Sequence, residues 1–107
     1  MFKDVIGLAE LKSVGKKRVL INDVALLMIY YENQVYAMSD RCPHLGASLE
    51  KGTLHEGIIT CPKHGAQIDI KTGNIIEKAK VLFLKLPTKK NTTYEVKVKE
   101  DRVLVKI

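Results

Sequence analysis

Two short segments of the 107-residue chain carry nearly the same order of residue types, and this near-repeat constrains the fold more than any other feature. Each segment is rich in proline and glycine, which fix φ and permit tight turns respectively, so each is predicted to be a turn. Both cysteines of the chain and two of its three histidines lie in these segments, Cys42-Pro43-His44-Leu45-Gly46-Ala47 and Cys61-Pro62-Lys63-His64-Gly65-Ala66. We therefore expect two turns that each present a thiolate and an imidazole.

The order of these ligands separates the possible metal sites. A set of two thiolates and two imidazoles suits zinc or an iron-sulfur centre. Common zinc fingers pair the two cysteines and pair the two histidines, whereas here the order alternates as C-x-H, 16 residues, C-x-x-H. Two such turns can clamp a binuclear cluster from both sides, with sulfur ligands on one iron and nitrogen ligands on the other. The pattern favours a 2Fe-2S cluster held by Cys42, His44, Cys61 and His64; a structural zinc module with the same four ligands stays an alternative.

The remaining histidine, His55, lies in a polar stretch and fits no ligand position, so we assign it no role. An oxygenase would need a second, mononuclear iron on two histidines and a carboxylate. With only His55 left over, the chain cannot assemble that site. We therefore expect no catalytic residues and no enzyme activity, only electron transfer.

Strand-like segments dominate the rest of the chain, because runs of Val, Ile, Leu and Tyr are broken at short intervals by turn residues. The only helical spacing is around Leu8 to Val14, where Gly15 ends the run. The predicted fold class is all-β and antiparallel. The expected strands are Arg18–Ile21, Val24–Tyr31, Gln34–Met38, Gly57–Thr60, Gln67–Ile70, Asn74–Glu77, Val81–Leu86, Thr93–Val98 and Arg102–Ile107.

Length and charge exclude several classes of protein. A chain of 107 residues fits one domain, spanning 1–107, and no segment has the roughly 20 apolar residues that would cross a bilayer. The formal charge of +6 is not gathered into a nucleic-acid motif, so we expect no nucleic acid and no membrane among the partners. The start of the chain lacks the pattern of a secretory signal, and cytoplasm is the expected location.

The sequence resembles the Rieske ferredoxins, which pass electrons from a reductase to the oxygenase component of ring-hydroxylating dioxygenase systems. The resemblance runs through Asp40-Arg41-Cys42-Pro43-His44, continues through Cys61-Pro62-Lys63-His64-Gly65-Ala66-Gln67-Ile68-Asp69, and reaches Thr93–Val98. It implies three stacked antiparallel sheets, with the cluster on a small subdomain at about residues 38–73. It also implies a soluble one-electron carrier with a reductase as donor and an oxygenase or reductase as acceptor.

Departures from related families bear on the reduction potential and on the partner. Respiratory Rieske proteins have a disulfide whose matching positions here are Ala47 and Lys63, and hydroxyl donors whose matching positions are Ala66 and Ile68. Without those hydroxyls the reduced cluster is less stabilised, so the resemblance implies a low potential within the Rieske range. A lysine beside His64 favours a partner with an acidic docking surface. The segment at 77–92 is also lysine-rich, and no role is assigned to it.

One further reading stays open within electron transfer. Small subunits of larger reductases, such as those of nitrite reductase, are similar in sequence to this family, although such subunits commonly lack the four ligands that are all present here. The sequence alone does not name the donor or the acceptor.

Overall fold

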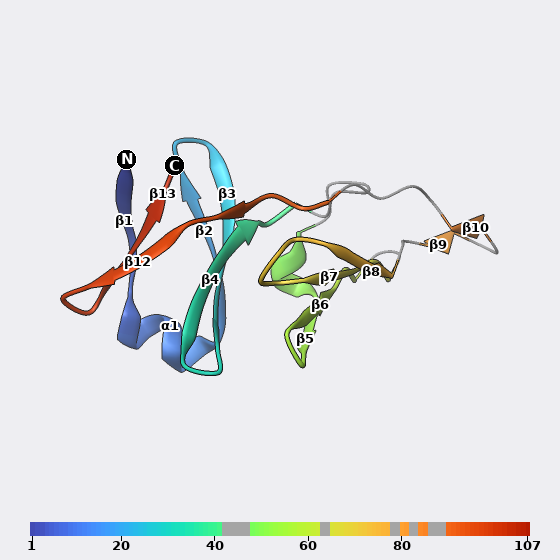
Figure 1. Cartoon of the computed structure of the whole chain (residues 1–107), viewed down its shortest axis with the longest axis horizontal. Coiled ribbons are helices and arrows are strands. Elements are labelled where there is room, and N and C mark those ends of the chain that lie inside the picture. The colour runs from blue at the N-terminus through green and yellow to red at the C-terminus, as the bar shows by residue number, and fades with distance from the viewer. Residues whose placement is uncertain (42–47, 63–64, 78–79, 82–83, 86–89) are drawn as a thin grey trace.

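The computed structural model describes residues 1–41, 48–62, 65–77, 80–81, 84–85 and 90–107, and this part of the chain is mainly β-structure (Figure 1). One short helix, α1 (Leu8–Val14), and one 3-10 turn, η1 (Leu49–Lys51), interrupt the strands. The strands are β1 (Phe2–Gly7), β2 (Lys16–Ile21), β3 (Val24–Tyr31), β4 (Gln34–Ser39), β5 (Thr53–His55), β6 (Ile58–Thr60), β7 (Gln67–Asp69), β8 (Ile75–Glu77), β9 (Lys80–Val81), β10 (Leu84–Lys85), β11 (Thr93–Tyr94), β12 (Val96–Lys99) and β13 (Arg102–Lys106).

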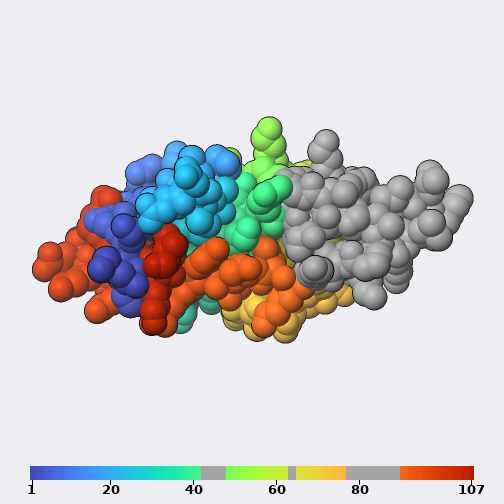
Figure 2. Space-filling model, turned by 90° about the horizontal axis from the view of Figure 1, so that it is seen from above, coloured from blue at the N-terminus to red at the C-terminus, as the bar shows by residue number. Residues whose placement is uncertain are grey.

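The strands form three antiparallel sheets of three or four strands, which confirms the predicted fold class. Their orders are β1-β13-β12, β11-β4-β3-β2 and β5-β6-β7-β8, and β9 pairs separately with β10. We call the three sheets the terminal sheet, the central sheet and the ligand sheet. The first and last strands, β1 and β13, lie side by side at one end of the molecule (Figures 1 and 2).

The central sheet separates two hydrophobic cores. Strand β3 carries four consecutive buried residues, Leu26 to Ile29, so it is covered on both faces. Because side chains alternate along a strand, Leu27 and Ile29 pack toward the ligand sheet while Leu26 and Met28 pack toward the terminal sheet. The molecule is therefore elongated, with extents of 48 × 26 × 19 Å.

Hairpin turns fix the register of these strands. The central pairs of three turns, Asn22-Asp23, Glu32-Asn33 and Glu100-Asp101, all have positive φ, between 48° and 64°. Two successive residues with positive φ are the signature of the type I′ turn, whose twist matches that of paired strands. These turns fall at or next to the gaps between consecutive strands that the sequence predicts.

Several predicted elements differ from the structure. The segment expected as one strand at Val81–Leu86 is wrong: β9 and β10 pair with each other, with Leu84 opposite Val81. The strand expected at Thr93–Val98 breaks at Glu95, because β11 pairs with β4 in the central sheet whereas β12 pairs with β13 in the terminal sheet. Gly57 lies in a turn with φ 77° rather than in β6.

Strands β1 and β5 were missed, while the helix at Leu8–Val14 is confirmed. Strand β1 is short, carries charge at Lys3 and Asp4 and is bulged between Asp4 and Ile6, so it shows no clean alternation. Its partner is β13, near the other end of the chain, which no local pattern reveals. In the described part of the chain, no helix is both long and apolar enough to span a bilayer.

Candidate metal centre

Of the four predicted ligands, Cys61 lies within the described residues, and Cys42, His44 and His64 lie outside them. The structure does describe the residues that flank each ligand segment. These are Asp40, Arg41 and Ser48 around the first, and Thr60 and Gln67 around the second, within which Gly65 and Ala66 are also described. The site is therefore built here from Cys61 and from these flanking positions.

Cys61 directly follows β6 and is 3% exposed. Its backbone N–H donates to the carbonyl of Ala66 at 2.8 Å, and its own carbonyl accepts from the N–H of Gly65 at 3.2 Å. Gly65 has φ 76°, a conformation that costs a residue with a Cβ more than it costs glycine. The second ligand segment is thus closed on itself by two backbone hydrogen bonds.

The thiol of Cys61 belongs to the hydrophobic core between the central sheet and the ligand sheet. Its neighbours in that core are apolar and fully buried, and they include Leu49, Ile59, Ala66 and Ile68. A thiolate in such surroundings needs a compensating charge, which a bound metal supplies. The buried sulfur is therefore suited to be a metal ligand, and the apolar side chains packed around it exclude water.

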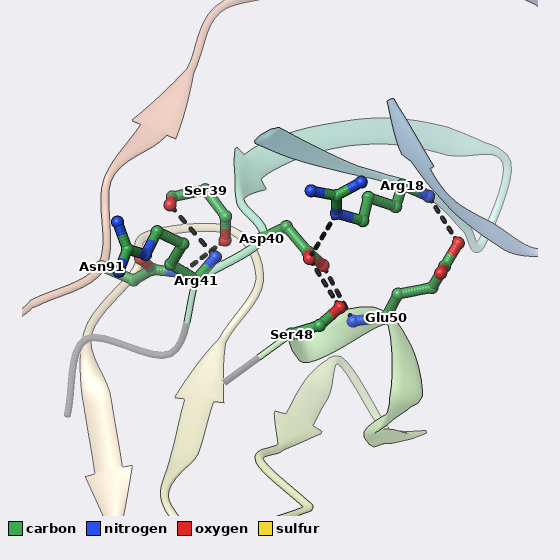
Figure 3. Close-up of polar contacts among 7 residues, drawn as sticks. All are labelled: Arg18, Ser39, Asp40, Arg41, Ser48, Glu50 and Asn91. Carbon is green, nitrogen blue, oxygen red and sulfur yellow. Dashed lines mark hydrogen bonds and ion pairs between the residues drawn. The ribbon is translucent and has the colours of Figure 1, made fainter. Parts of the chain in front are cut away.

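The two ends of the first ligand segment meet each other. Arg41 and Ser48 form an isolated antiparallel bridge, and the Leu49 N–H donates to the carbonyl of Asp40 at 2.7 Å. The Asp40 side chain, 2% exposed, accepts from Ser48 Oγ at 2.6 Å and from the Glu50 N–H at 2.9 Å. Figure 3 shows these contacts at the end of β4.

The 3-10 turn η1, which directly follows Ser48, connects the residues after the first ligand segment with the residue before the second. At its end, a Cβ on Gly52 would lie 2.2 Å from the carbonyl oxygen of Thr60, so the two backbones are in close contact. Thr60 is the residue before Cys61, and Leu49 shares the core with Cys61. The structure therefore places η1, which follows the first ligand segment, against the residue that precedes the second.

A third segment, just before β11, supports the end of β4. Asn91, 4% exposed, donates from Nδ2 to the carbonyl of Ser39 at 3.1 Å, and its N–H donates to the Gly73 carbonyl at 2.8 Å. A Cβ on Gly73 would lie 2.1 Å from the carbonyl oxygen of Asn91, so only glycine fits there. Figure 3 shows Asn91 beside Ser39.

Sequence reasoning missed the structural roles of Asp40 and Asn91. An acidic residue two positions before Cys42 was a usable signal for Asp40, whereas nothing local distinguishes Asn91. The prediction for His55 fits the structure, where its side chain is 82% exposed and lies 3.7 Å from Glu56 Oε1. No cluster of three or more potential metal ligands is found among the residues that the structure describes.

Comparisons with known proteins agree with this geometry. Residues 3–87 match the family model described as the Rieske [2Fe-2S] domain. The chain is 32% identical, over 105 residues, to the 3-phenylpropionate/cinnamic acid dioxygenase ferredoxin subunit of Photorhabdus laumondii; the match covers 96% of this chain and 91% of that protein. It is also 32% identical over 81 residues to human apoptosis-inducing factor 3. That match covers 76% of this chain but only 12% of the other, much longer protein.

A solved structure is similar across nearly the whole chain. In the complex of reduced oxygenase and oxidized ferredoxin in carbazole 1,9a-dioxygenase, one chain superposes with a TM-score of 0.79 at 30% identity, covering 97% of this chain and 91% of that chain. The family model, the relatives and the fold agree with the ligand spacing and with the buried cysteine. The chain therefore belongs to the Rieske [2Fe-2S] domain family, whose cofactor is a 2Fe-2S cluster.

Proposed function

We propose that this chain is a one-electron carrier whose cluster is held by Cys42, His44, Cys61 and His64. The observation that carries the proposal is the position of Cys61. Its side chain is buried, and the residue before it, Thr60, contacts Gly52 at the end of η1. When bound, the cluster supplies reversible one-electron chemistry. The chain itself holds the ligands, shields the sulfur side from water and presents the other side to a partner. It is not itself an enzyme.

The residues beside Cys61 favour a low reduction potential. Ala66 and Ile68 are both fully buried and carry no side-chain hydrogen-bond donor. A donor to a cluster sulfur stabilises the more negative, reduced state, so its absence lowers the potential. The carrier is therefore suited to accept electrons from a reductase and to deliver them to an oxygenase, the roles that the ferredoxin relatives imply.

A groove beside the first ligand segment carries charges of both signs, because Asp23 and Asp40 line it together with two arginines. It has a volume of about 370 Å³, and its walls include Arg18, Arg41 and Ser48. Arg41 is exposed next to Cys42 in the chain, and Leu20, 59% exposed, adds an apolar contact at the same groove. Arg18 is paired with the buried Asp40, so the exposed Arg41 is the cation that acidic side chains on the reductase or oxygenase would meet here.

The proposal includes a single domain, residues 1–107, with the ligand subdomain at about 38–73, and a cytoplasmic location. The ligand sheet spans Thr53 to Glu77, and its core is continuous with one face of β3. Thiols that serve as cluster ligands must stay reduced, as they do in the cytoplasm.

A redox titration of the purified, reconstituted protein tests the function. The expected result is reversible uptake of one electron per two irons, followed as bleaching of the visible absorption and its recovery on reoxidation. The matched control is Cys61→Ser, which removes one proposed ligand and should abolish the signal. Uptake of two electrons per chain, or an unchanged signal in Cys61→Ser, would contradict the proposal.

A further inference from the structure

Asp40 is a buried carboxylate whose two oxygens are both occupied. Oδ1 accepts from the Glu50 N–H at 2.9 Å, and Oδ2 accepts from Ser48 Oγ at 2.6 Å and lies 3.2 Å from Arg18 Nε (Figure 3). Burying a carboxylate is costly unless it is paired and hydrogen-bonded. Asp40 meets both conditions, with two hydrogen bonds and one ion pair. Its position two residues before Cys42 places this costly group at the start of the first ligand segment.

The partners of Asp40 come from the far end of that segment and from β2, which lies two strands from β4 in the central sheet. Ser48 and Glu50 follow the segment, whereas Arg18 comes from β2. Glu50 is itself fixed, because its Oε2 accepts from the Arg18 N–H at 2.7 Å and its carbonyl accepts from Lys16 Nζ. We call Arg18, Asp40, Ser48 and Glu50 the clasp.

The clasp reaches the second ligand segment through the backbone. Glu50 lies in η1, which ends at Gly52 in contact with the Thr60 carbonyl, one residue before Cys61. A shift of Ser48 or Glu50 therefore moves the ends of both ligand segments relative to each other. Fixing the ends of a loop in advance removes entropy that ligand binding would otherwise have to overcome.

We propose that Asp40 is a positioning residue, which holds the ends of the 42–47 segment in the arrangement that retains the cluster. This inference rests on the proposed function. The clasp touches the flanks of the ligand segments, so its effect is on the lifetime and environment of the cluster. A role limited to stabilising the fold would instead lower the unfolding temperature and leave cluster retention in the folded protein unchanged.

The variant Asp40→Asn tests the clasp at nearly constant volume. An amide has one acceptor oxygen and one donor nitrogen, so it cannot accept on both sides, and at least one of the three contacts becomes donor against donor. The matched control is Asp4→Asn, which breaks another Asp-Arg pair, with Arg102 at 2.8 Å, in the terminal sheet. The milder variant Ser48→Ala removes one hydroxyl and keeps the ion pair with Arg18.

The measurement is the rate of cluster loss to an iron chelator at 25 °C, followed by visible absorption in proteins shown to be folded by circular dichroism. We expect loss about tenfold faster in Asp40→Asn, several-fold faster in Ser48→Ala and unchanged in Asp4→Asn. The reduction potential of Asp40→Asn should rise, because a negative charge two residues before the proposed ligand Cys42 is removed. If Asp40→Asn does not fold, Ser48→Ala decides.

Two results would overturn the inference, and they are distinguishable. Folded Asp40→Asn and Ser48→Ala proteins that lose the cluster at the wild-type rate would show that the clasp does not position the ligands, and the proposed function would stand. A wild-type protein that takes up no cluster on reconstitution would remove the proposed function, and the inference with it.

Discussion

At the scale of single residues, Ala66 and Ile68 give the surroundings of Cys61 their apolar character. Both are fully buried in the same core as the cysteine, and Ala66 also accepts the Cys61 N–H through its carbonyl. This places a backbone contact and an apolar side chain, rather than a hydroxyl, beside the sulfur. We therefore attribute part of the low reduction potential proposed for this chain to the absence of a hydroxyl at Ala66.

Replacing Ala66 with serine tests that origin. A hydroxyl that donates to a sulfur should favour the reduced state by about 1 kcal/mol, which raises the potential by about 40 mV for one electron. The measurement is a potentiometric titration. The matched control is Ala37→Ser, the same change at a buried alanine in the other core. Equal potentials in both variants and wild type would contradict the argument.

Tyr31 provides a residue-scale prediction about pH. Partial burial, together with the nearby charges of Glu32 and Glu56, raises its pKa above the ordinary 10.0. The folded protein therefore favours the neutral phenol of Tyr31. The stability that this preference contributes is complete below pH 10 and is lost as pH rises through the raised pKa. The difference in absorbance at 295 nm between wild type and Tyr31→Phe should titrate above pH 10. In Glu32→Gln the same midpoint should move down; an unmoved midpoint would count against the assigned cause.

The sequence predicts which residues are ligands, and this stays a prediction, but it does not reveal the residues that support them. The spacing of cysteine and histidine is local information that survives without a structure. Asp40 and Asn91 act on partners that lie up to 52 residues away, as Asn91 does on Ser39. Their roles depend on how strands pair, and the sequence motif alone does not contain that pairing.

At the scale of elements, β3 was the most predictable strand because its run of apolar residues matches burial on both faces. Strand β1 was missed because its partner is distant, and the strand expected at Thr93–Val98 is divided because its partners lie in different sheets. Glu95 shows the reason: its surroundings look like a continuous strand, but the chain leaves one sheet and enters another there. Local propensity indicates extended backbone and does not indicate which sheet accepts it.

The type I′ turns give a prediction about stability. Glu100 has φ 51°, a conformation that asparagine tolerates better than glutamate. The variant Glu100→Asn should therefore stabilise the hairpin of β12 and β13 by about 0.5 kcal/mol and raise the unfolding midpoint by about 2–4 °C. Thermal unfolding followed by circular dichroism measures the shift. Glu95→Asn, an exposed residue outside the turn, is the control, and an equal rise there would refute the explanation.

At the scale of the whole molecule, the terminal sheet and the proposed ligand site lie on opposite sides of the central sheet. Charge near the site should therefore affect partner encounter, while charge on the terminal sheet should not. Removing the charge of Arg41 with Arg41→Gln should slow electron transfer to an acidic partner a few-fold at low salt. The difference should vanish at about 0.5 M salt, where screening is strong.

The rate is measured by stopped-flow mixing with the oxygenase or reductase components of a ferredoxin-dependent dioxygenase system. Lys99→Gln, which removes an exposed positive charge from β12, is the matched control and should keep the wild-type rate. A loss of rate that is equal in the two variants would show that only net charge matters and that the groove beside Arg41 is not the docking surface.

The mixed ligation of the cluster is the central claim, and the reduced-state electron paramagnetic resonance spectrum of anaerobically purified protein tests it most directly, with iron and zinc content measured on the same sample. Two irons per chain and an average g value below that of all-cysteine 2Fe-2S clusters are predicted, because two histidines replace two cysteines on one iron. Stoichiometric zinc without iron, even after reconstitution with iron and sulfide, would contradict the account.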